Sequence, residues 1–264
     1  MADDIVMYEV ADRVALITWN RPERMNAWTA ALEDAYFDAL ERATDDEDVN
    51  VIVVTGAGRG FCPGADMDLL QGLGGDEGSL TSGERRAVTF PLGVPKPIIG
   101  AINGACAGVG LVQALMFDVR FAAAGAKWTT AFSRRGLIAE YGSAWLLPRL
   151  VGTSAAMDLL LSARVFLSEE AAALGLANRV VDADDLLAET MAYARDIASS
   201  CSPASLAVMK KQIYGAWEQT LSEAGAESFQ RMVHSLQGPD FVEGVQSYVQ
   251  RRPAEFKPLG QGTV

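Results

Sequence analysis

Residues 97–123 constrain the fold more than any other part of the chain, because a strand, a turn, a helix and a second strand follow one another there. The apolar run at residues 97–102 predicts a strand. A glycine turn follows, then a helix is expected over about 108–117 and another strand over 118–123. This order is a β-α-β crossover. The chain is therefore expected to fold around an α/β core.

The rest of the first half fits such a core. Residues 6–20 alternate as two strands, residues 31–46 show helical periodicity, and residues 50–55 form a continuous apolar strand. Uninterrupted apolar strands are typical of sheets that are covered on both faces. Residues 61–73 predict a turn that leads into a short helix, and the polar, glycine-rich residues 74–86 are expected to be mobile.

The second half of the chain has a helical pattern. Thr153 and Ser168 suit the N-cap position of two helices, and Gly175 suits the end of the second. A long helix is expected over residues 182–200. These helices follow the sheet-forming half, so they are expected to pack around it.

The last part of the sequence forms a region of its own. Residues 203–250 are predicted to be helical, with a break at Pro239. We therefore expect a core at residues 1–200 and a C-terminal helical region at residues 201–264. Helices appended to an α/β core in this way often cover a neighbouring subunit.

Composition excludes several classes of protein. The formal net charge of −12 argues against nucleic-acid binding, which needs a concentrated basic face. The three cysteines are widely spaced and there is one histidine, so neither a metal site nor a disulfide framework is expected. The sequence has no apolar run long enough for a membrane span and starts with acidic residues, which predicts a cytoplasmic protein.

Two glycine-rich turns are candidates for ligand binding. The turn at residues 56–60 follows a strand, but Phe61, Cys62 and Pro63 stand where a nucleotide-binding helix would begin. The turn at residues 104–110 does open a helix, whose free N–H groups stabilise negative charge. Each turn alone can be a tight connection. Together they can direct two backbone N–H groups at one oxygen, which makes an oxyanion hole.

Several motifs resemble the enoyl-CoA hydratase/isomerase, or crotonase, superfamily, in the order in which that superfamily has them. They cover nearly the whole chain. The resemblance is carried by NRPERMNAW at 20–28, VIVVTGAGRGFCPGADM at 51–67, PKPIIGAINGACAGVG at 95–110, RGLIAEYGSAWLLPRLVG at 135–152, LSEEAAALGLANRVV at 167–181 and RRPAEFK at 251–257.

The resemblance implies a fold, a ligand and a pair of donors. The fold would be a crotonase-like spiral of β-β-α units with a C-terminal helical trimerisation region, assembled as a trimer or as a hexamer of two trimers. The ligand would be an acyl-CoA thioester, which is the substrate, with no separate cofactor. The thioester carbonyl would lie between the backbone N–H groups of Ala65 and Val109.

The sequence departs from the hydratases of the superfamily at their two glutamates. The matching positions are Val112 and Phe132, which cannot move a proton or orient water. Glu140, eight residues after Phe132, matches a position where some isomerases and a dehalogenase of the superfamily carry their carboxylate. Its apolar neighbours in sequence are expected to raise its pKa.

Glu140 also has two structural interpretations. Its side chain could cap the helix that begins near Ser143. It could instead pair with one of three nearby cations, Arg134, Arg135 or Arg149.

The resemblance further implies a coenzyme A site. It places Arg24 and Met25 near the adenine and Lys257, of the same or a neighbouring subunit, near the phosphates. The other residues assigned to this site are Ala27, Gly64, Asp66, Met67, Gly108 and Phe132.

These observations predict an enzyme that stabilises a thioester enolate, with Glu140 moving the proton. A single carboxylate suits double-bond isomerisation better than hydration, because one base can remove a proton at one carbon and return it at another. Two alternatives remain open. The chain could be a catalytically silent acyl-CoA-binding protein, or a hydrolase in which Glu140 activates water.

Overall fold

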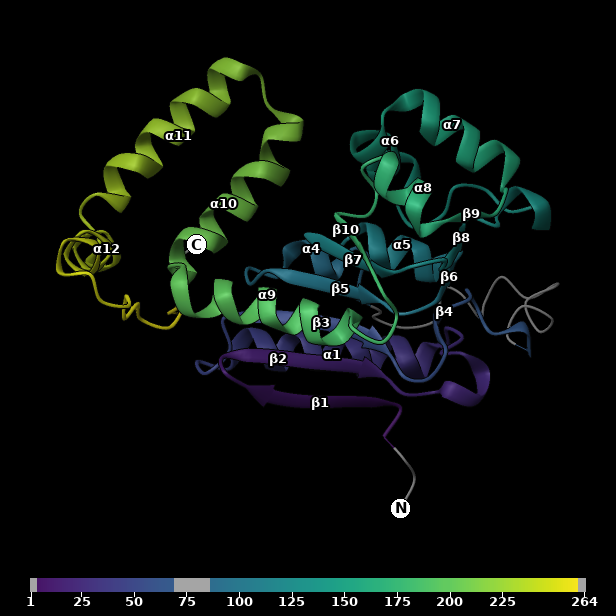
Figure 1. The fold of residues 1–264 in the computed structure, drawn as a ribbon. Helices are drawn as coiled ribbons and strands as arrows, with labels where there is room; N and C mark the ends of the chain where they lie inside the picture. The colour runs from purple at the N-terminus through teal and green to yellow at the C-terminus, as the bar shows by residue number, and fades with distance from the viewer. Residues whose placement is uncertain (1–3, 69–85, 261–264) are drawn as a thin grey trace.

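The computed structural model describes residues 4–68 and 86–260, which form two sheets and a set of surrounding helices (Figure 1). Most of the short helix expected within residues 61–73, and nearly all of the segment 74–86 that is expected to be mobile, fall outside the described residues. Both therefore stay predictions.

The larger sheet has six strands in the order β1-β2-β3-β5-β7-β10. β1 and β2 form the expected antiparallel hairpin, and every later neighbour pairs in parallel. The strands β3 and β5 are buried along their whole length, as expected for a covered sheet. The bounds are β1 Val6–Ala11, β2 Val14–Trp19, β3 Val51–Gly56, β5 Ile98–Ile102, β7 Val119–Ala123 and β10 Arg179–Val181.

The smaller sheet has the order β4-β6-β8-β9 and was not predicted from the sequence. Its strands are β4 Gly60–Cys62, β6 Ala105–Ala107, β8 Lys127–Thr129 and β9 Phe166–Leu167. Runs of two or three residues are too short to show a periodicity. Each of β3, β5 and β7 is followed directly by a strand of the smaller sheet, so the chain winds through both sheets as a spiral of β-β-α units.

The helices α1 and α9 pack against the larger sheet, whereas the last helices of the chain extend away from it (Figure 1). α9 packs against β2, β3, β5 and β7, whereas α1 packs against β1 and β2 (Figure 1). The bounds are α1 Ala30–Asp45, α4 Phe90–Gly93, α5 Val109–Leu115, α6 Ser143–Val151, α7 Thr153–Ser162, α8 Ser168–Ala173, α9 Leu186–Ser200, α10 Pro203–Gly215, α11 Leu221–Ser235 and α12 Pro239–Gln250, with short 3₁₀ helices η1 Pro22–Arg24, η2 Ser133–Arg135 and η3 Ala216–Glu218.

Two expected helix caps differ by one residue. Thr153 is the first residue of α7 rather than its cap, because Gly152 takes the cap position. Ser168 is likewise the first residue of α8, and its hydroxyl donates to the Ala123 carbonyl instead of capping the helix. The expected break at Pro239 is confirmed, because α11 ends at Ser235 and Pro239 begins α12, a position that proline suits since no N–H is needed there. Gly175 does follow α8, with a φ of 80°.

The core beside the smaller sheet contains a cluster of aromatic side chains. The Trp19 ring lies 5.2 Å from the Trp28 ring and 4.6 Å from the Phe61 ring, measured between centroids. The Trp28 indole N–H donates to the buried Glu33 carboxylate over 3.0 Å. The Trp28 ring packs against Trp19 and its indole N–H is bound by Glu33, so both its apolar and its polar part have partners. These contacts fix the loop that runs from β2 to α1.

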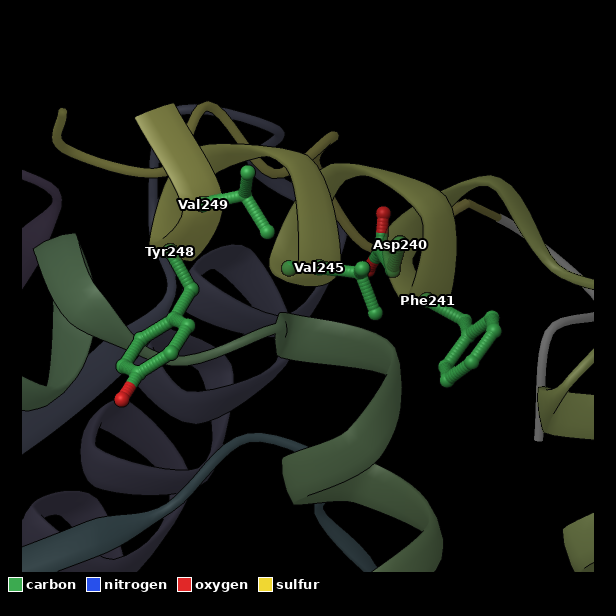
Figure 2. Close-up of a pocket in the computed structure, with 6 residues that line it drawn as sticks. Asp240, Phe241, Val245, Tyr248 and Val249 are labelled. Atoms are coloured by element: carbon green, nitrogen blue, oxygen red, sulfur yellow. The ribbon is translucent and has the colours of Figure 1, made fainter. Parts of the chain in front are cut away.

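The helices α10, α11 and α12 extend away from the sheets, on the side opposite to β4 and β6 (Figure 1). Their surface is unusually apolar for helices in contact with solvent. On α12 a shallow groove is lined by Asp240, Phe241, Gly244, Val245, Tyr248 and Val249. Figure 2 shows Phe241, Val245 and Tyr248 projecting from the same side of this helix. Within residues 4–68 and 86–260, no helix has the length and apolar character that crossing a membrane requires.

Candidate active site

The turn that follows β4, at Gly64, meets the turn that follows β6, at Gly108. The first of the two predicted glycine-rich turns, residues 56–60, leads into β4 instead. A methyl group added to Gly64 would lie 3.4 Å from the Ala107 carbonyl oxygen, and one added to Gly108 would lie 3.5 Å from the Gly64 Cα. Gly64 has a φ of 110° and Gly108 combines a φ of 50° with a ψ of −126°. Both conformations are accessible mainly to glycine. The two backbones are therefore in van der Waals contact, and the positive φ angles, rather than a lack of space, are what call for glycine at both positions.

Ala65 and Val109, the residues that follow these glycines, each have a backbone N–H group that points away from the neighbouring hydrogen-bonded backbone. The Gly64 carbonyl accepts from Trp28 N over 2.9 Å, and Trp28 O accepts from Asp66 N over 2.9 Å, in a parallel bridge between Trp28 and Ala65. In a planar trans peptide the N–H points opposite to the C=O. The Ala65 N–H therefore points away from Trp28.

Val109 has the same arrangement at the start of α5. The Gly108 carbonyl accepts from Val112 N over 3.0 Å, so the Val109 N–H points away from the helix. Across the part of the chain that the structure describes, neither the Ala65 nor the Val109 N–H has a backbone acceptor. Two unengaged donors thus lie beside the contact between Gly64 and Gly108.

The segment assigned to coenzyme A packs against the first of these turns. Arg24 pairs with Asp68 over 3.2 Å, and both side chains are largely exposed. Met25 adopts a left-handed conformation and contacts Gly60, where an added methyl group would lie 3.1 Å from the Met25 Cβ. Ala27 is buried, whereas Met67 is half exposed. The structure therefore brings residues 24–27 and 64–68 together.

Two residues of this region were missed from the sequence. Arg21 donates to the Ala27 carbonyl over 2.5 Å and to the Asp66 carboxylate over 3.1 Å. Asn26 is fully buried, and its amide donates to the carbonyls of Ala57 and Gly60. Both stand inside the quoted motif NRPERMNAW, but local sequence gives no sign that Arg21 reaches a carboxylate 45 residues away.

Glu140 lies in the turn that precedes α6. Its carbonyl accepts from Ser143 N over 2.9 Å, but its carboxylate does not cap α6, because the cap residue is Gly142 and no side chain caps that helix. Within the described residues it forms no ion pair, so pairing with an arginine is wrong as well. Burial raises the pKa of the Glu140 carboxyl above its usual value of 4.5.

The expected cause of that pKa shift, the apolar neighbours of Glu140 in sequence, is wrong. Leu137 is 38% exposed and Ile138 is 79% exposed, so these sequence neighbours do not enclose the carboxylate. Leu137 and Ile138 lie in an irregular segment between η2 and α6. In such a segment the apolar character of a residue does not predict that it is buried. The half-buried state of Glu140 comes from its position against the rest of the fold.

The positions that carry glutamates in the hydratases are apolar and enclosed. Val112 is fully buried on α5, and Phe132 is 4% exposed at the start of η2. Both belong to the main hydrophobic core. Neither can take part in proton transfer.

Lys257 is exposed in the segment that follows α12. α12 stands on the opposite side of the sheets from β4 and β6, where residues 24–27 and 64–68 come together (Figure 1).

Among the described residues, no group of three or more His, Cys, Asp or Glu side chains could hold a metal ion. Cys62 and Cys106 are paired across β4 and β6 and are fully buried. Burial raises the pKa of the Cys62 thiol to about 12 and that of Cys106 well above its usual value. Such thiols are inert at neutral pH.

Comparison with known proteins decides the family. A family model described as enoyl-CoA hydratase/isomerase matches residues 9–259. The chain belongs to the enoyl-CoA hydratase/isomerase family. It is an enzyme of this family and acts on acyl-CoA.

Two relatives illustrate the range of names within the family. A protein of Rhodobacter capsulatus named "probable enoyl-CoA hydratase" is 36% identical over 261 residues, which cover 97% of this chain and 99% of the relative. A 1,2-epoxyphenylacetyl-CoA isomerase of Escherichia coli is 33% identical over 261 residues, covering 96% of this chain and 98% of the relative.

Solved structures of the family share the fold. A Mycobacterium abscessus structure named "probable enoyl-CoA hydratase/isomerase" superposes with a TM-score of 0.88 at 29% identity, covering 96% of this chain and 99% of the other. An enoyl-CoA hydratase of Mycobacterium marinum is 49% identical, with a TM-score of 0.71 over 82% of this chain and 100% of the other. The expected crotonase fold is thereby confirmed.

Proposed function

We propose that this enzyme polarises the thioester carbonyl of an acyl-CoA between the Ala65 and Val109 N–H groups, and that Glu140 moves the proton. The observation that carries the proposal is the contact between Gly64 and Gly108, with an unengaged N–H group immediately after each. One such donor can lower a barrier by about 3–4 kcal/mol. Since the donors are amides, the side chain at Val109 does not matter for the hydrogen bond, although it adds bulk beside the thioester.

The proposed reaction is a double-bond isomerisation rather than a hydration. Glu140 would remove a proton from the α-carbon of a 3-enoyl-CoA, giving a dienolate whose charge is held on the thioester oxygen. The same carboxyl, whose proton exchanges with solvent, would deliver a proton to the γ-carbon, giving a 2-enoyl-CoA. Two observations support this choice: buried Val112 and Phe132 leave no pair of carboxylates to orient water, and an isomerase stands among the relatives.

The coenzyme would be held by the loop that carries Arg24, Met25 and Ala27, next to Gly64, Asp66 and Met67. Lys257 would reach the phosphates from a neighbouring subunit, because α12, which precedes it, stands on the opposite side of the sheets from β4 and β6 (Figure 1). Acyl-CoA enters as the substrate, and proton transfer through an enolate needs no further cofactor. A cytoplasmic location stays part of the proposal.

Assembly as a homotrimer, or as a hexamer of two trimers, is the quaternary structure we propose. The apolar side chains on α11 and α12 support it, with Leu221 90% exposed and Tyr248 85% exposed. Light scattering coupled to size-exclusion chromatography should give three or six times 28.2 kDa. A monomer at micromolar concentration would contradict the proposal.

Incubation of the enzyme with a 3-enoyl-CoA or with crotonyl-CoA in deuterated water tests the reaction. Isomerisation predicts deuterium at the α- and γ-carbons and conversion of the 3-enoyl to the 2-enoyl thioester. Release of free coenzyme A would instead indicate a hydrolase. Binding with neither label nor product would indicate the catalytically silent protein.

A further inference from the structure

Arg21 joins the coenzyme A loop to the turn that carries the first oxyanion donor. One guanidinium nitrogen donates to the Ala27 carbonyl over 2.5 Å, and the other donates to Asp66 Oδ2 over 3.1 Å. Its own backbone N–H donates to the Asn26 side chain over 2.9 Å. The Arg21 guanidinium thus binds Ala27 of its own loop with one nitrogen and Asp66, the residue after Ala65, with the other.

This ion pair is sheltered, unlike the pair next to it. The side chains of Arg21 and Asp66 are 19% and 8% exposed, whereas Arg24 and Asp68 are 55% and 74% exposed. Exposed pairs contribute little, because water and salt screen them. The Asp68 N–H and the Arg21 guanidinium together hold the pKa of the Asp66 carboxyl below its usual range.

The orientation of the Ala65 N–H depends on the strand-like bridge that Arg21 spans. The Gly64 carbonyl and the Ala65 N–H belong to one peptide unit, so the bond from Trp28 N to Gly64 O sets the direction of that N–H. Arg21 binds the residue before Trp28, and it also binds the residue after Ala65. Arg21 therefore acts as a clamp, because it binds both chain segments of the bridge, the one with Trp28 and the one with Ala65.

We propose that Arg21 is a positioning residue, which holds the Ala65 N–H in register with the Val109 N–H through its paired contacts with Ala27 and Asp66. The inference rests on the function proposed above. Arg21 acts through Asp66 and does not touch the thioester. The same guanidinium also holds the loop of Arg24 and Met25 in place, through the Ala27 carbonyl.

Carbonyl infrared spectroscopy tests the proposal without turnover. Butyryl-CoA labelled with ¹³C at the carbonyl would be bound to the wild-type enzyme and to Arg21→Met. The wild type should move the carbonyl stretch to lower wavenumber, because two donors polarise it. Arg21→Met should lose most of that shift. Arg195→Met serves as a matched control, since it breaks an exposed ion pair with Asp12 and should keep the full shift.

Kinetics separate positioning from coenzyme binding. Arg21→Met should lower kcat by about 10–100-fold, as expected when a donor is misplaced by about 1 Å. KM should stay within about threefold, and a pantetheine thioester should lose the same factor as the CoA thioester. Arg21→Lys should recover little, because one ammonium cannot span both acceptors. If Arg21→Met does not fold, Asp66→Asn provides the same test with nearly unchanged volume.

Three results would overturn the inference. A full carbonyl shift with wild-type kcat in Arg21→Met would show that the clamp is not needed. A raised KM confined to the CoA thioester would make Arg21 a coenzyme-binding residue instead. A wild-type enzyme that produces no carbonyl shift would overturn the proposed oxyanion hole, and the inference with it.

Discussion

Gly64 and Gly108 pack backbone against backbone, so that a methyl group added to Gly108 would lie 3.5 Å from the Gly64 Cα. The two glycines belong to turns that are 44 residues apart, each of which follows a strand of the smaller sheet. β4 and β6 are paired in parallel, which places the turns after them at the same edge. The contact explains how two amides distant in sequence can serve one oxygen.

Val109→Pro should abolish the second donor and leave the fold intact. Proline is favoured at the first position of a helix, where Val109 stands, and the residue before it is a glycine without a Cβ to clash. We expect kcat to fall about 10²–10³-fold, with an unchanged circular dichroism spectrum. Val109→Ala keeps the amide and should retain activity. Wild-type rates in Val109→Pro would contradict a role for this N–H group.

Glu140→Gln should retain coenzyme A affinity and lose turnover. Glutamine has the same shape but cannot accept the proton, so the rate of deuterium exchange at the α-carbon should fall by about 10²–10⁴-fold. Calorimetric titration with coenzyme A would check that binding is unchanged. Unaltered exchange would assign the proton transfer to another group.

The pH dependence of activity should follow the same carboxyl. Burial raises the pKa of Glu140 above 4.5, and only the ionised form is a base. The value of kcat/KM should therefore rise with pH through the raised pKa and then level off. If the residual kcat/KM of Glu140→Gln still rises with pH over the same range, a different titrating group would be responsible for the rise.

Glu140→Gln should also stabilise the folded protein at neutral pH. Since the folded-state pKa is raised, the folded chain binds this proton more readily than the unfolded chain, and stability falls as pH rises through that window. Above that pH window Glu140 is ionised, and its partly buried charge lowers the free energy of unfolding. Glutamine is uncharged and removes this destabilisation. The Tm difference should favour Glu140→Gln at pH 7 and shrink below pH 4.5, whereas Glu9→Gln on exposed β1 should show none.

Lys210→Met should loosen the C-terminal helices from the core. Lys210 on α10 pairs over 2.8 Å with Asp118, which also accepts from Ile98 N and from the Tyr214 hydroxyl. Removing one partner of a buried pair costs about 3–5 kcal/mol, because the other charge stays buried. Urea unfolding would measure the loss. Lys211→Met, at the neighbouring exposed position, should change stability by less than about 0.5 kcal/mol.

The sequence predicts the long, regular elements of this fold well. The crossover at residues 97–123 and the hairpin at residues 6–20 are confirmed, because five or six apolar or alternating residues suffice to identify a strand. The segment 203–250, predicted to be helical with a break at Pro239, has that break and a second one near residue 216, where a 3₁₀ turn separates α10 from α11. The smaller sheet escapes prediction because its strands are two or three residues long, although this sheet positions both glycine turns.

The candidate site was predicted in part, and its supporting contacts were not. Ala65 and Val109 follow from motifs, since a motif fixes a position in the chain. The pair of Arg21 with Asp66 depends on how two distant segments pack, and no local pattern encodes it. Glu140 is half-buried by tertiary packing, whereas the apolar residues beside it in sequence are exposed. Sequence neighbours are therefore a poor guide to the surroundings of a residue in a turn.

A structure of the enzyme with a bound acyl-CoA would test the oxyanion hole itself. The thioester oxygen should lie about 2.7–3.1 Å from both Ala65 N and Val109 N, with the Glu140 carboxylate beside the α-carbon. An acyl-CoA whose carbonyl oxygen is bound elsewhere, with both amides unengaged, would contradict the proposed oxyanion hole.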